Sequence, residues 1–154
     1  MTQKVLFVCL GNICRSPIAE AVFQNLVNQK GLSNQWVVDS AAIGPWHVGK
    51  QPDHRARQIL QNHNIPYNGR ARQIEKKDFN EFDFIFGMDE ENISDLHSRA
   101  PRDSKAKILL LGDFDPEGDK IIRDPYYDDG SEGFEKCYKQ CLRASEGFLK
   151  QHIN

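Results

Sequence analysis

The sequence predicts one α/β domain over residues 1–154, built as a three-layer sandwich in which a four-stranded, mostly parallel sheet lies between helices. Three observations lead to this fold class. The length of 154 residues is typical of a single domain with one core. Short apolar segments alternate with longer segments of helical periodicity, an order that favours right-handed crossovers between parallel strands. No internal repeat or linker interrupts the alternation, so a flavodoxin-like or Rossmann-like arrangement is expected.

The first three elements are expected to be a strand, a loop and a helix. Residues 4–9 are apolar and rich in Val, Leu and Phe, as in a strand buried on both faces. Residues 10–16 include Gly11 and Asn12, which are typical of loops. We expect Ser16 to cap the following helix, Pro17 to occupy its first turn and Gly31 to end it.

The remaining elements continue this alternation. Further strands are predicted at residues 36–42, 82–86 and 108–111, and further helices at residues 53–64, 75–82, 89–99 and from Phe134 onward. Asp89 is expected to cap the helix that follows it. The acidic segment 112–133 contains several Gly and two Pro residues and is predicted to be a long surface loop. Loops of this length are usually functional or disordered.

The overall charge and the cysteine content exclude several classes of protein. A formal net charge of −2 offers no broad basic surface for nucleic acid or an anionic membrane. No segment approaches the roughly 20 apolar residues of a membrane span. The apolar residues 5–10 are followed by no signal-peptide cleavage pattern. The four cysteines are best explained as reduced thiols, so we expect a cytoplasmic protein.

The loop between the first strand and helix carries the strongest chemical signal, because Cys9 and Arg15 are separated by five residues. In a strand-to-helix turn, free backbone N–H groups and the helix N-terminus converge on a site for an anion. Arg15 would grip two phosphate oxygens at once. The residues expected to complete the phosphate-binding loop are Leu10, Gly11, Asn12, Ile13, Cys14 and Ser16.

The same environment favours the thiolate form of Cys9, which would then attack phosphorus in line. Ser16 is expected to donate a hydrogen bond to the sulfur. The spacing alone is not specific, because Cys137 and Arg143 repeat it. That second copy is predicted to lie inside a helix, where bonded N–H groups cannot form a cradle, and Cys137 and Cys141 are expected in the core.

An attacking thiolate needs an acid that protonates the departing oxygen. Two Asp-Pro pairs, at Asp115 and Asp124, lie in the acidic segment. Asp124 is favoured because Tyr126 and Tyr127 follow it and would wall a slot for an aryl phosphate. Asp115 is interpreted as a solvated turn residue.

The segment Cys9-Leu-Gly-Asn-Ile-Cys-Arg-Ser-Pro, together with Asp124-Pro-Tyr-Tyr, resembles the low-molecular-weight protein tyrosine phosphatase (acid phosphatase) family. The likeness extends over nearly the whole chain. It implies hydrolysis of phosphotyrosine proteins in two steps through a phosphocysteine on Cys9, with Asp124 as acid and then base. It also implies that Ser40 supports Asn12, that no metal or cofactor takes part, and that inorganic phosphate is product and inhibitor. A mainly monomeric protein with weak self-association is expected.

The resemblance also assigns roles around the loop. Cys14 is implied to form a reversible disulfide with the nucleophile, the alternative being that it only packs. Trp46 is implied to lie at the substrate rim with Tyr126 and Tyr127. Gly69 stands where some relatives have a His, so no role of that His transfers. The histidines other than His63, namely His47, His54, His97 and His152, are interpreted as surface or loop residues without metal-ligand spacing.

Three alternatives stay open beside this hypothesis. An arsenate reductase would need further cysteines to relay a disulfide, and none lies between Cys14 and Cys137. A protein-arginine phosphatase typically has Thr where this chain has Ile13. A non-catalytic phosphotyrosine-binding module or redox switch would not need Cys9, Arg15 and Asp124 together.

Overall fold

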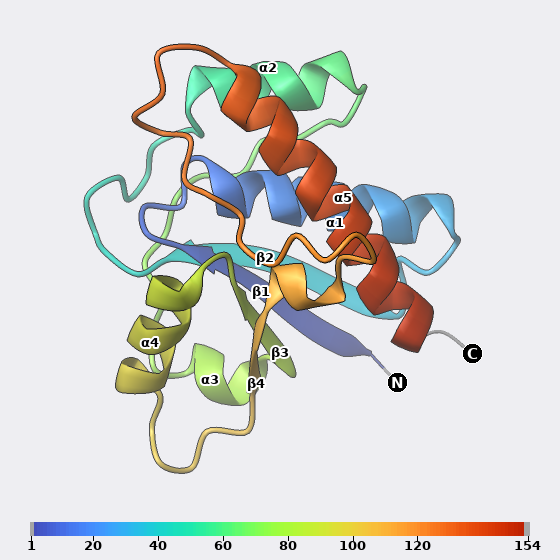
Figure 1. Cartoon of the computed structure of the whole chain (residues 1–154). Helices are drawn as coiled ribbons and strands as arrows, with labels where there is room; N and C mark the ends of the chain where they lie inside the picture. Colours follow the sequence, from blue (N-terminus) through green and yellow to red (C-terminus); the bar gives the residue numbers. More distant parts are fainter. Residues whose placement is uncertain (1, 153–154) are drawn as a thin grey trace.

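In the computed structural model, which describes residues 2–152, four parallel strands form one sheet in the order β2-β1-β3-β4 (Figure 1). The elements in chain order are β1 (Gln3–Cys9), α1 (Arg15–Gln29), β2 (Trp36–Ala42), α2 (His54–Asn62), α3 (Asp78–Glu81), β3 (Phe84–Gly87), α4 (Glu90–Arg99), β4 (Lys107–Leu110), the 3₁₀ helix η1 (Leu111–Phe114) and α5 (Glu132–His152). The predicted parallel α/β sheet is confirmed.

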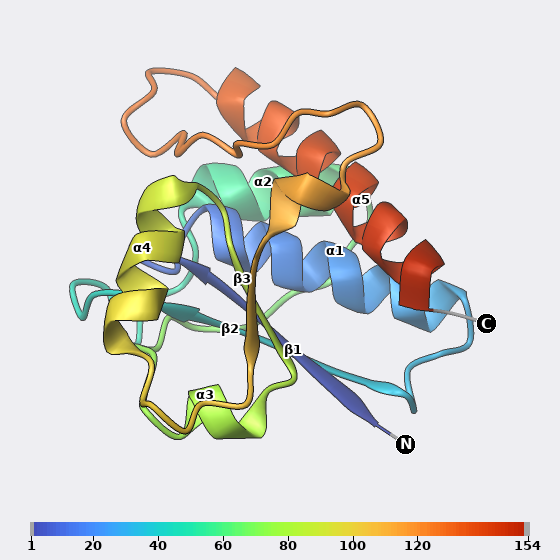
Figure 2. The ribbon, with the colours of Figure 1, turned by 60° about the horizontal axis from the view of Figure 1, so that its bottom comes forward.

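Helices cover both faces of the sheet, with α1, α2 and α5 on one side and α3 and α4 on the other (Figures 1 and 2). The central strand β1 explains the two layers, because its side chains alternate between two hydrophobic clusters. Val5 and Phe7 pack with α1 and α5, whereas Leu6 and Val8 pack with α3 and α4. All four side chains have no exposed surface, which accounts for the uninterrupted apolar sequence.

The carboxyl end of β1 lies where the order of strands in the sheet reverses direction. After β1 the chain passes to β2 on one side, and it later returns to β3 on the other side of β1. In open α/β sheets, ligands bind beyond the carboxyl ends of strands at such a point. Cys9 is the last residue of β1 and therefore lies there.

The start of α1 differs from the sequence prediction. The helix begins at Arg15, the position before it is Cys14, and no side chain caps it, so the prediction that Ser16 is the N-cap was wrong. The Ser16 hydroxyl lies within hydrogen-bond distance of Cys9 and Asn12 instead. The Ser16 N–H donates to the Cys9 sulfur, so within the first turn of α1 this donor faces the thiol rather than a capping oxygen.

The acidic segment 112–133 is only partly a surface loop. It begins within η1, and Ile122 and Asp115 are buried in it. The N–H of Ile122 donates to the Met88 carbonyl at 3.0 Å, and Gln140 Nε2 donates to the Ile121 carbonyl at 2.9 Å. Helix α3 is also shorter than predicted, since only residues Asp78–Glu81 are helical.

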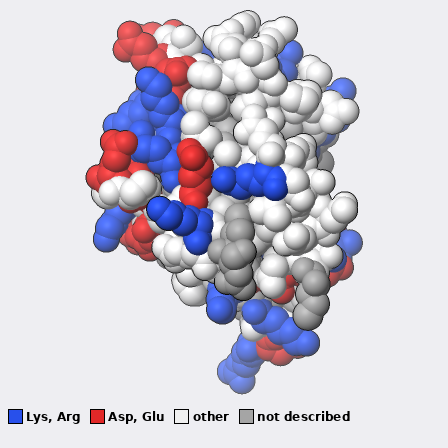
Figure 3. All heavy atoms as spheres, turned by 90° about the vertical axis from the view of Figure 1, so that its right-hand side faces the viewer, with Lys and Arg blue, Asp and Glu red and all other residues white. Residues whose placement is uncertain are grey.

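The face of the molecule at the right of Figure 1 carries few charged side chains over much of its area (Figure 3). The end of α1 and the loop after it contribute to this face, and in residues 24–35 Lys30 is the only charged residue. Within residues 2–152, no helix has the combination of length and apolar composition that a membrane span requires.

Candidate active site

The loop between β1 and α1 is held in place by its carbonyl oxygens. Those of Cys9, Leu10 and Ile13 accept hydrogen bonds from the N–H groups of residues 43, 44 and 53 at 3.0, 3.1 and 2.7 Å. Asn12 adopts a left-handed backbone conformation with φ of 57°. The described structure gives no intramolecular acceptor to the N–H groups of residues 11–14, so they can serve a bound anion.

Cys9 lies at the base of this loop and is only 3% exposed. Its Sγ is 3.0 Å from the Ser16 Oγ, and the Ser16 N–H donates to the same sulfur at 3.4 Å. The Cys9 sulfur therefore lies within hydrogen-bond distance of two groups of Ser16, its hydroxyl and its backbone N–H.

Arg15 is buried beside Cys9, and only one nitrogen of its guanidinium group, Nη1, makes hydrogen bonds to other described residues. Its Nη1 donates to Asp89 Oδ2 at 2.6 Å and to the Ile122 carbonyl at 3.0 Å. Its Nη2 lies 3.6 Å from Asp124 Oδ2, and its Nε has no partner in the described structure. Burial opposes the charged form, but Cys9, Asp89 and Asp124 raise the pKa of Arg15 above its usual value.

Sequence reasoning missed the role of Asp89 at this site. The residue caps α4 as predicted, since its Oδ1 accepts from the Asn92 N–H at 2.8 Å. Its other carboxylate oxygen forms the ion pair with Arg15. One signal was available in the sequence: Asp89 closely follows a buried strand, and the carboxyl ends of neighbouring parallel strands meet at one edge.

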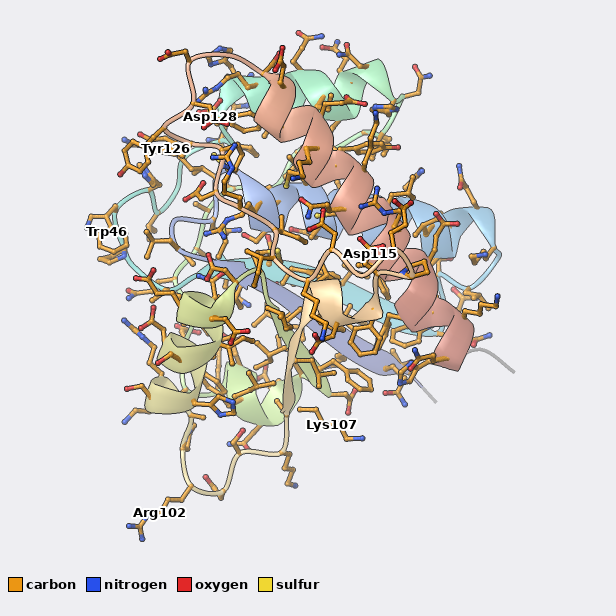
Figure 4. All side chains as sticks on the ribbon, viewed as in Figure 1. Trp46, Arg102, Lys107, Asp115, Tyr126 and Asp128 are labelled. Carbon is orange, nitrogen blue, oxygen red and sulfur yellow. The ribbon has the colours of Figure 1, made fainter. Side chains whose placement is uncertain are left out.

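A pocket of about 330 Å³ opens above the loop. It is lined by Cys9, Leu10, Gly11, Ile13, Cys14, Trp46, His47, Asp124, Tyr126 and Tyr127. Trp46 and Tyr126 both project from loops on the left side of the molecule (Figure 4). Trp46 is 62% exposed and Tyr127 is 85% exposed, so both lie at the rim, and Tyr126 is half-buried.

His47 belongs to the pocket as well, although the sequence suggested only a surface or loop residue. It lies in the loop after β2, and a Cβ on Gly11 would come within 2.9 Å of its ring. The ring is 6.1 Å from that of Tyr126. The signal for His47 was weak, because only its position next to Trp46 pointed to the pocket.

The segment that carries Asp124 is fixed by Arg55, which sequence reasoning also missed. Arg55 donates to the carbonyls of Tyr126, Asp128 and Gly130 at 2.8, 2.6 and 3.3 Å. Asp53, the N-cap of α2, binds the same guanidinium at 3.1 Å. Helix α2 thereby holds the wall of the pocket that contains Asp124 and Tyr126.

Asp115 is not a solvated turn residue, so that prediction was wrong. Its side chain has no exposed surface and accepts hydrogen bonds from Arg143 Nε and Nη2 at 3.0 to 3.2 Å. Burial opposes its ionisation, but the bonds from Arg143 and from the Glu117 N–H lower the pKa of Asp115. Asp115 lies beside α5, away from Trp46 and Tyr126 (Figure 4).

The other cysteines are all buried free thiols. Cys14 lies at the start of α1, where burial first and then Cys9 raise its pKa. Cys137 and Cys141 lie on the buried side of α5, which confirms that they belong to the core. Within residues 2–152, no three Cys, His, Asp or Glu side chains form a group that could hold a metal ion.

In the described part of the chain, a buried thiol below free loop N–H groups, an Arg with an unpaired Nε and a carboxylate in the same pocket form the arrangement expected of a cysteine-dependent phosphatase of the α/β class. The chain belongs to the low molecular weight phosphotyrosine protein phosphatase family, whose model matches residues 4–154. It is 53% identical over 150 residues to low molecular weight phosphotyrosine protein phosphatase 2 of Drosophila melanogaster, covering 97% of this chain and 92% of that one.

Two solved structures extend the comparison. The crystal structure of Primo-1 superposes with a TM-score of 0.95 at 51% identity, covering 99% of this chain and 100% of that one. The crystal structure of DARP, drosophila arginine phosphatase, superposes with a TM-score of 0.93 at 40% identity, covering 99% of each chain. DARP is named an arginine phosphatase whereas the matching family is named for phosphotyrosine, so the fold alone does not choose the phosphorylated residue.

Proposed function

We propose that this chain is a protein tyrosine phosphatase that hydrolyses phosphotyrosine in proteins, and small aryl phosphates, through a phosphocysteine on Cys9. The observation that supports this best is the unused edge of Arg15. Its Nη1 is bound to Asp89 and Ile122, whereas its buried Nε is unpaired. A phosphate in the loop would take Nε and Nη2 as a bidentate pair, which removes the unsatisfied donor.

In the first step the Cys9 thiolate attacks phosphorus in line and forms the S–P bond. The bond between phosphorus and the phenolic oxygen breaks, and its electron pair remains on that oxygen, which takes a proton from Asp124. The loop N–H groups and Arg15 stabilise the charge on the phosphoryl oxygens in the transition state. Asp124 lies within reach because its Oδ2 is 3.6 Å from Arg15 Nη2.

In the second step a water attacks the phosphocysteine. Asp124, now ionised, accepts a proton from the water, the S–P bond breaks and Cys9 leaves as a thiolate. Inorganic phosphate remains in the loop until it dissociates, so it is both product and competitive inhibitor. Every reacting group in this cycle comes from the chain, the substrate or water.

The walls of the pocket favour an aromatic substrate. Tyr126, Tyr127 and Trp46 offer ring faces around the mouth, and Ile13 contributes an apolar surface inside it. A phosphoarginine side chain would present a charged guanidinium to these walls. Ile13, in place of the Thr expected of an arginine phosphatase, therefore favours phosphotyrosine, and protein-arginine phosphatase activity is the second candidate because of the similarity to DARP.

The protein is proposed to act in the cytoplasm as a mainly monomeric single domain over residues 1–154, with weak self-association and without a cofactor. Cys14 is proposed as the redox partner of Cys9. Peroxide would oxidise the Cys9 thiolate to a sulfenic acid, and the Cys14 thiol would then displace water to form a disulfide. Recovery by thiol reductant after peroxide should be lost in Cys14→Ser, and unchanged recovery would show that Cys14 only packs.

The test uses three substrates with the purified protein: a phosphotyrosine peptide, a phosphoarginine peptide and arsenate. We expect turnover of the phosphotyrosine peptide, and none after Cys9→Ser. Faster turnover of phosphoarginine would favour the second candidate. Inertness toward phosphotyrosine with reduction of arsenate would contradict the proposal.

A further inference from the structure

A continuous chain of hydrogen bonds leads from Cys9 to Tyr67, in the segment after α2. It passes through side chains of the loop, α1, β2 and the segment after α2. The contacts are Cys9 Sγ–Ser16 Oγ at 3.0 Å, Ser16 Oγ–Asn12 Nδ2 at 2.7 Å, Asn12 Nδ2–Ser40 Oγ at 3.0 Å, Ser40 Oγ–Glu20 Oε1 at 2.6 Å and Glu20 Oε1–Tyr67 Oη at 2.7 Å. Cys9, Asn12, Ser16 and Ser40 are at most 3% exposed.

The direction of donation along this chain follows from Asn12. Its Oδ1 accepts from the Arg72 N–H at 3.1 Å, which fixes which end of the amide is nitrogen. The two hydrogens of Nδ2 then go to Ser16 and Ser40. Each serine hydroxyl therefore accepts from Asn12 and must send its own hydrogen elsewhere. Ser40 sends it to Glu20, and Ser16 sends it to the sulfur of Cys9.

Glu20 determines the direction at the far end of the chain. An ionised carboxylate is an acceptor only, so it can receive hydrogens from both Ser40 and Tyr67 and can give none back. Burial raises the pKa of Glu20, and the bonds from Ser40 and Tyr67 oppose that rise. The charged neighbours Asp39 and Arg72 act in opposite directions, since Asp39 raises this pKa and Arg72 lowers it.

Tyr67 supplies the second donor that Glu20 needs. Burial, followed by the charge of Glu20, raises the pKa of Tyr67, so the phenol keeps its proton and donates it. The adjacent backbone makes room for the ring. A Cβ on Gly69 would lie 2.3 Å from Tyr67 Oη and 2.5 Å from its Cζ, so any side chain at Gly69 would displace the phenol.

We propose that Tyr67 and Glu20 are positioning residues for the nucleophile, because they orient the network so that Ser16 donates its hydrogen to Cys9. Gly69 is the third part of this device, since it leaves the space that the phenol occupies. The inference rests on the proposed function only in that Cys9 is the nucleophile. The state of the Cys9 thiol can be measured without any substrate.

The test compares Tyr67→Phe with wild type by the pH dependence of Cys9 alkylation, followed by peptide mass spectrometry. Without the hydrogen bond from Tyr67 the pKa of Glu20 rises further, which favours a protonated carboxyl that donates to Ser40 instead of accepting from it. The bonds of Asn12 to the two serines are then disturbed, and the donation from Ser16 to the Cys9 sulfur weakens. We expect the midpoint of alkylation to move up by about half a pH unit to one unit, and the acidic limb of kcat/KM to move with it. On the acidic limb, below the midpoint, kcat/KM should fall by about 3- to 10-fold, whereas its plateau at higher pH should change little.

Two more variants and one control sharpen the test. Glu20→Ala removes Oε1, the single oxygen that accepts from both Ser40 and Tyr67, so its shift should be at least as large. Gly69→Ala keeps the phenol but displaces it, and it should shift the midpoint in the same direction. Tyr138→Phe is the control, because Tyr138 is a buried tyrosine of α5 that stacks on His63 at 3.8 Å. Its midpoint should equal that of wild type.

A merely structural role would lower thermal stability in Tyr67→Phe while leaving the alkylation midpoint and the pH profile in place, and this result would overturn the proposal. Should Tyr67→Phe not fold, an unchanged midpoint in Glu20→Ala decides against it equally. A wild-type protein that alkylates at Cys9 but does not hydrolyse phosphotyrosine would contradict the proposed function and not the network.

Discussion

The molecule contains two Cys–Arg pairs with the same spacing, and in each the Arg faces an Asp that precedes a Pro. Arg15 lies 3.6 Å from Asp124, and Arg143 lies 3.0 Å from Asp115. In α5 the backbone N–H groups are bonded within the helix, and Arg143 uses both Nε and Nη2 on Asp115. At the loop, the N–H groups and Arg15 Nε are unused.

The two regions therefore differ in whether their hydrogen-bond donors already have acceptors within the protein. The same residue types form an ion pair where Arg143 gives both Nε and Nη2 to one carboxylate, and a candidate ligand site where Arg15 Nε and the loop N–H groups have no acceptor in the described structure. The four predictions that follow substitute corresponding residues in the two regions. The loop variants should change catalysis, and the α5 variants should change stability.

The largest effect is expected for the two cysteines. Cys9→Ser replaces the thiolate by a weak nucleophile, so kcat toward phosphotyrosine should fall by at least about 10³-fold. Cys137→Ser should retain kcat within about twofold and should lose about 1 to 2 kcal/mol of unfolding free energy, because it adds a buried hydroxyl. Steady-state kinetics and urea unfolding of both variants check this. A comparable loss of kcat in both variants would contradict the proposed difference between Cys9 and Cys137.

The second largest effect is expected for the two arginines. Arg15→Lys replaces a planar fork by a point charge, and kcat/KM should fall by about 10²- to 10³-fold. Arg143→Lys should leave kcat/KM near wild type, because Arg143 contacts Asp115 and not the pocket. Kinetics on the same phosphotyrosine peptide measure both. Normal kcat/KM in the Arg15→Lys variant would show that bidentate binding is not needed.

For Asp124→Ala, the effect should depend on the leaving group. A phenol as poor as tyrosine needs its proton, so kcat should fall by about 10²-fold or more. A nitrophenolate leaves without a proton, so phosphorylation of Cys9 should be affected much less. Pre-steady-state rates with the two substrates provide the measurement. Equal losses for both would exclude Asp124 as the acid of the first step.

The smallest effect on catalysis is expected for Asp115→Asn, which should act on stability. Removing the charge of the buried carboxylate weakens its pairing with Arg143, which keeps Glu117 and Asp119 as acidic neighbours, and should cost about 1 to 2 kcal/mol at pH 7. Because the pKa of Asp115 is lowered in the fold, its contribution is complete above about pH 4 and is lost as the pH falls further. Urea unfolding at several pH values should show the two proteins converging in acid. A constant difference down to the lowest pH would contradict this.

Particular residues show which parts of the fold and of the site could be predicted from the sequence. The apolar run of β1, the Cys9–Arg15 loop and the Asp124-Pro125 pair carried local signals, and the fold followed from the alternation of elements. Ser16 was mistaken for a cap because a serine before Pro17 favours that role, whereas the geometry turns its hydroxyl to Cys9. The second prediction for Ser16, a hydrogen bond to the Cys9 sulfur, agrees with the distance of 3.0 Å between the two atoms.

The missed residues share a different cause. Arg55 bonds to the Asp128 carbonyl across 73 positions of the chain, and Asp89 bonds to Arg15 across 74. Such pairs leave no periodic or spacing signal, since each residue has an ordinary local role, Asp89 as a helix cap and Arg55 in the first turn of α2. Asp115 was misjudged for the same reason, because its partner Arg143 lies on α5.

The central claim is that Cys9 becomes phosphorylated during turnover. The most direct measurement is to mix Asp124→Ala with a nitrophenyl phosphate, quench in acid and locate the phosphoryl group by peptide mass spectrometry. This variant lacks the base for the second step, so the intermediate should accumulate. We predict one phosphoryl group on the peptide that contains Cys9. Product release without any phosphorylated cysteine, or a phosphoryl group on another residue, would contradict the account.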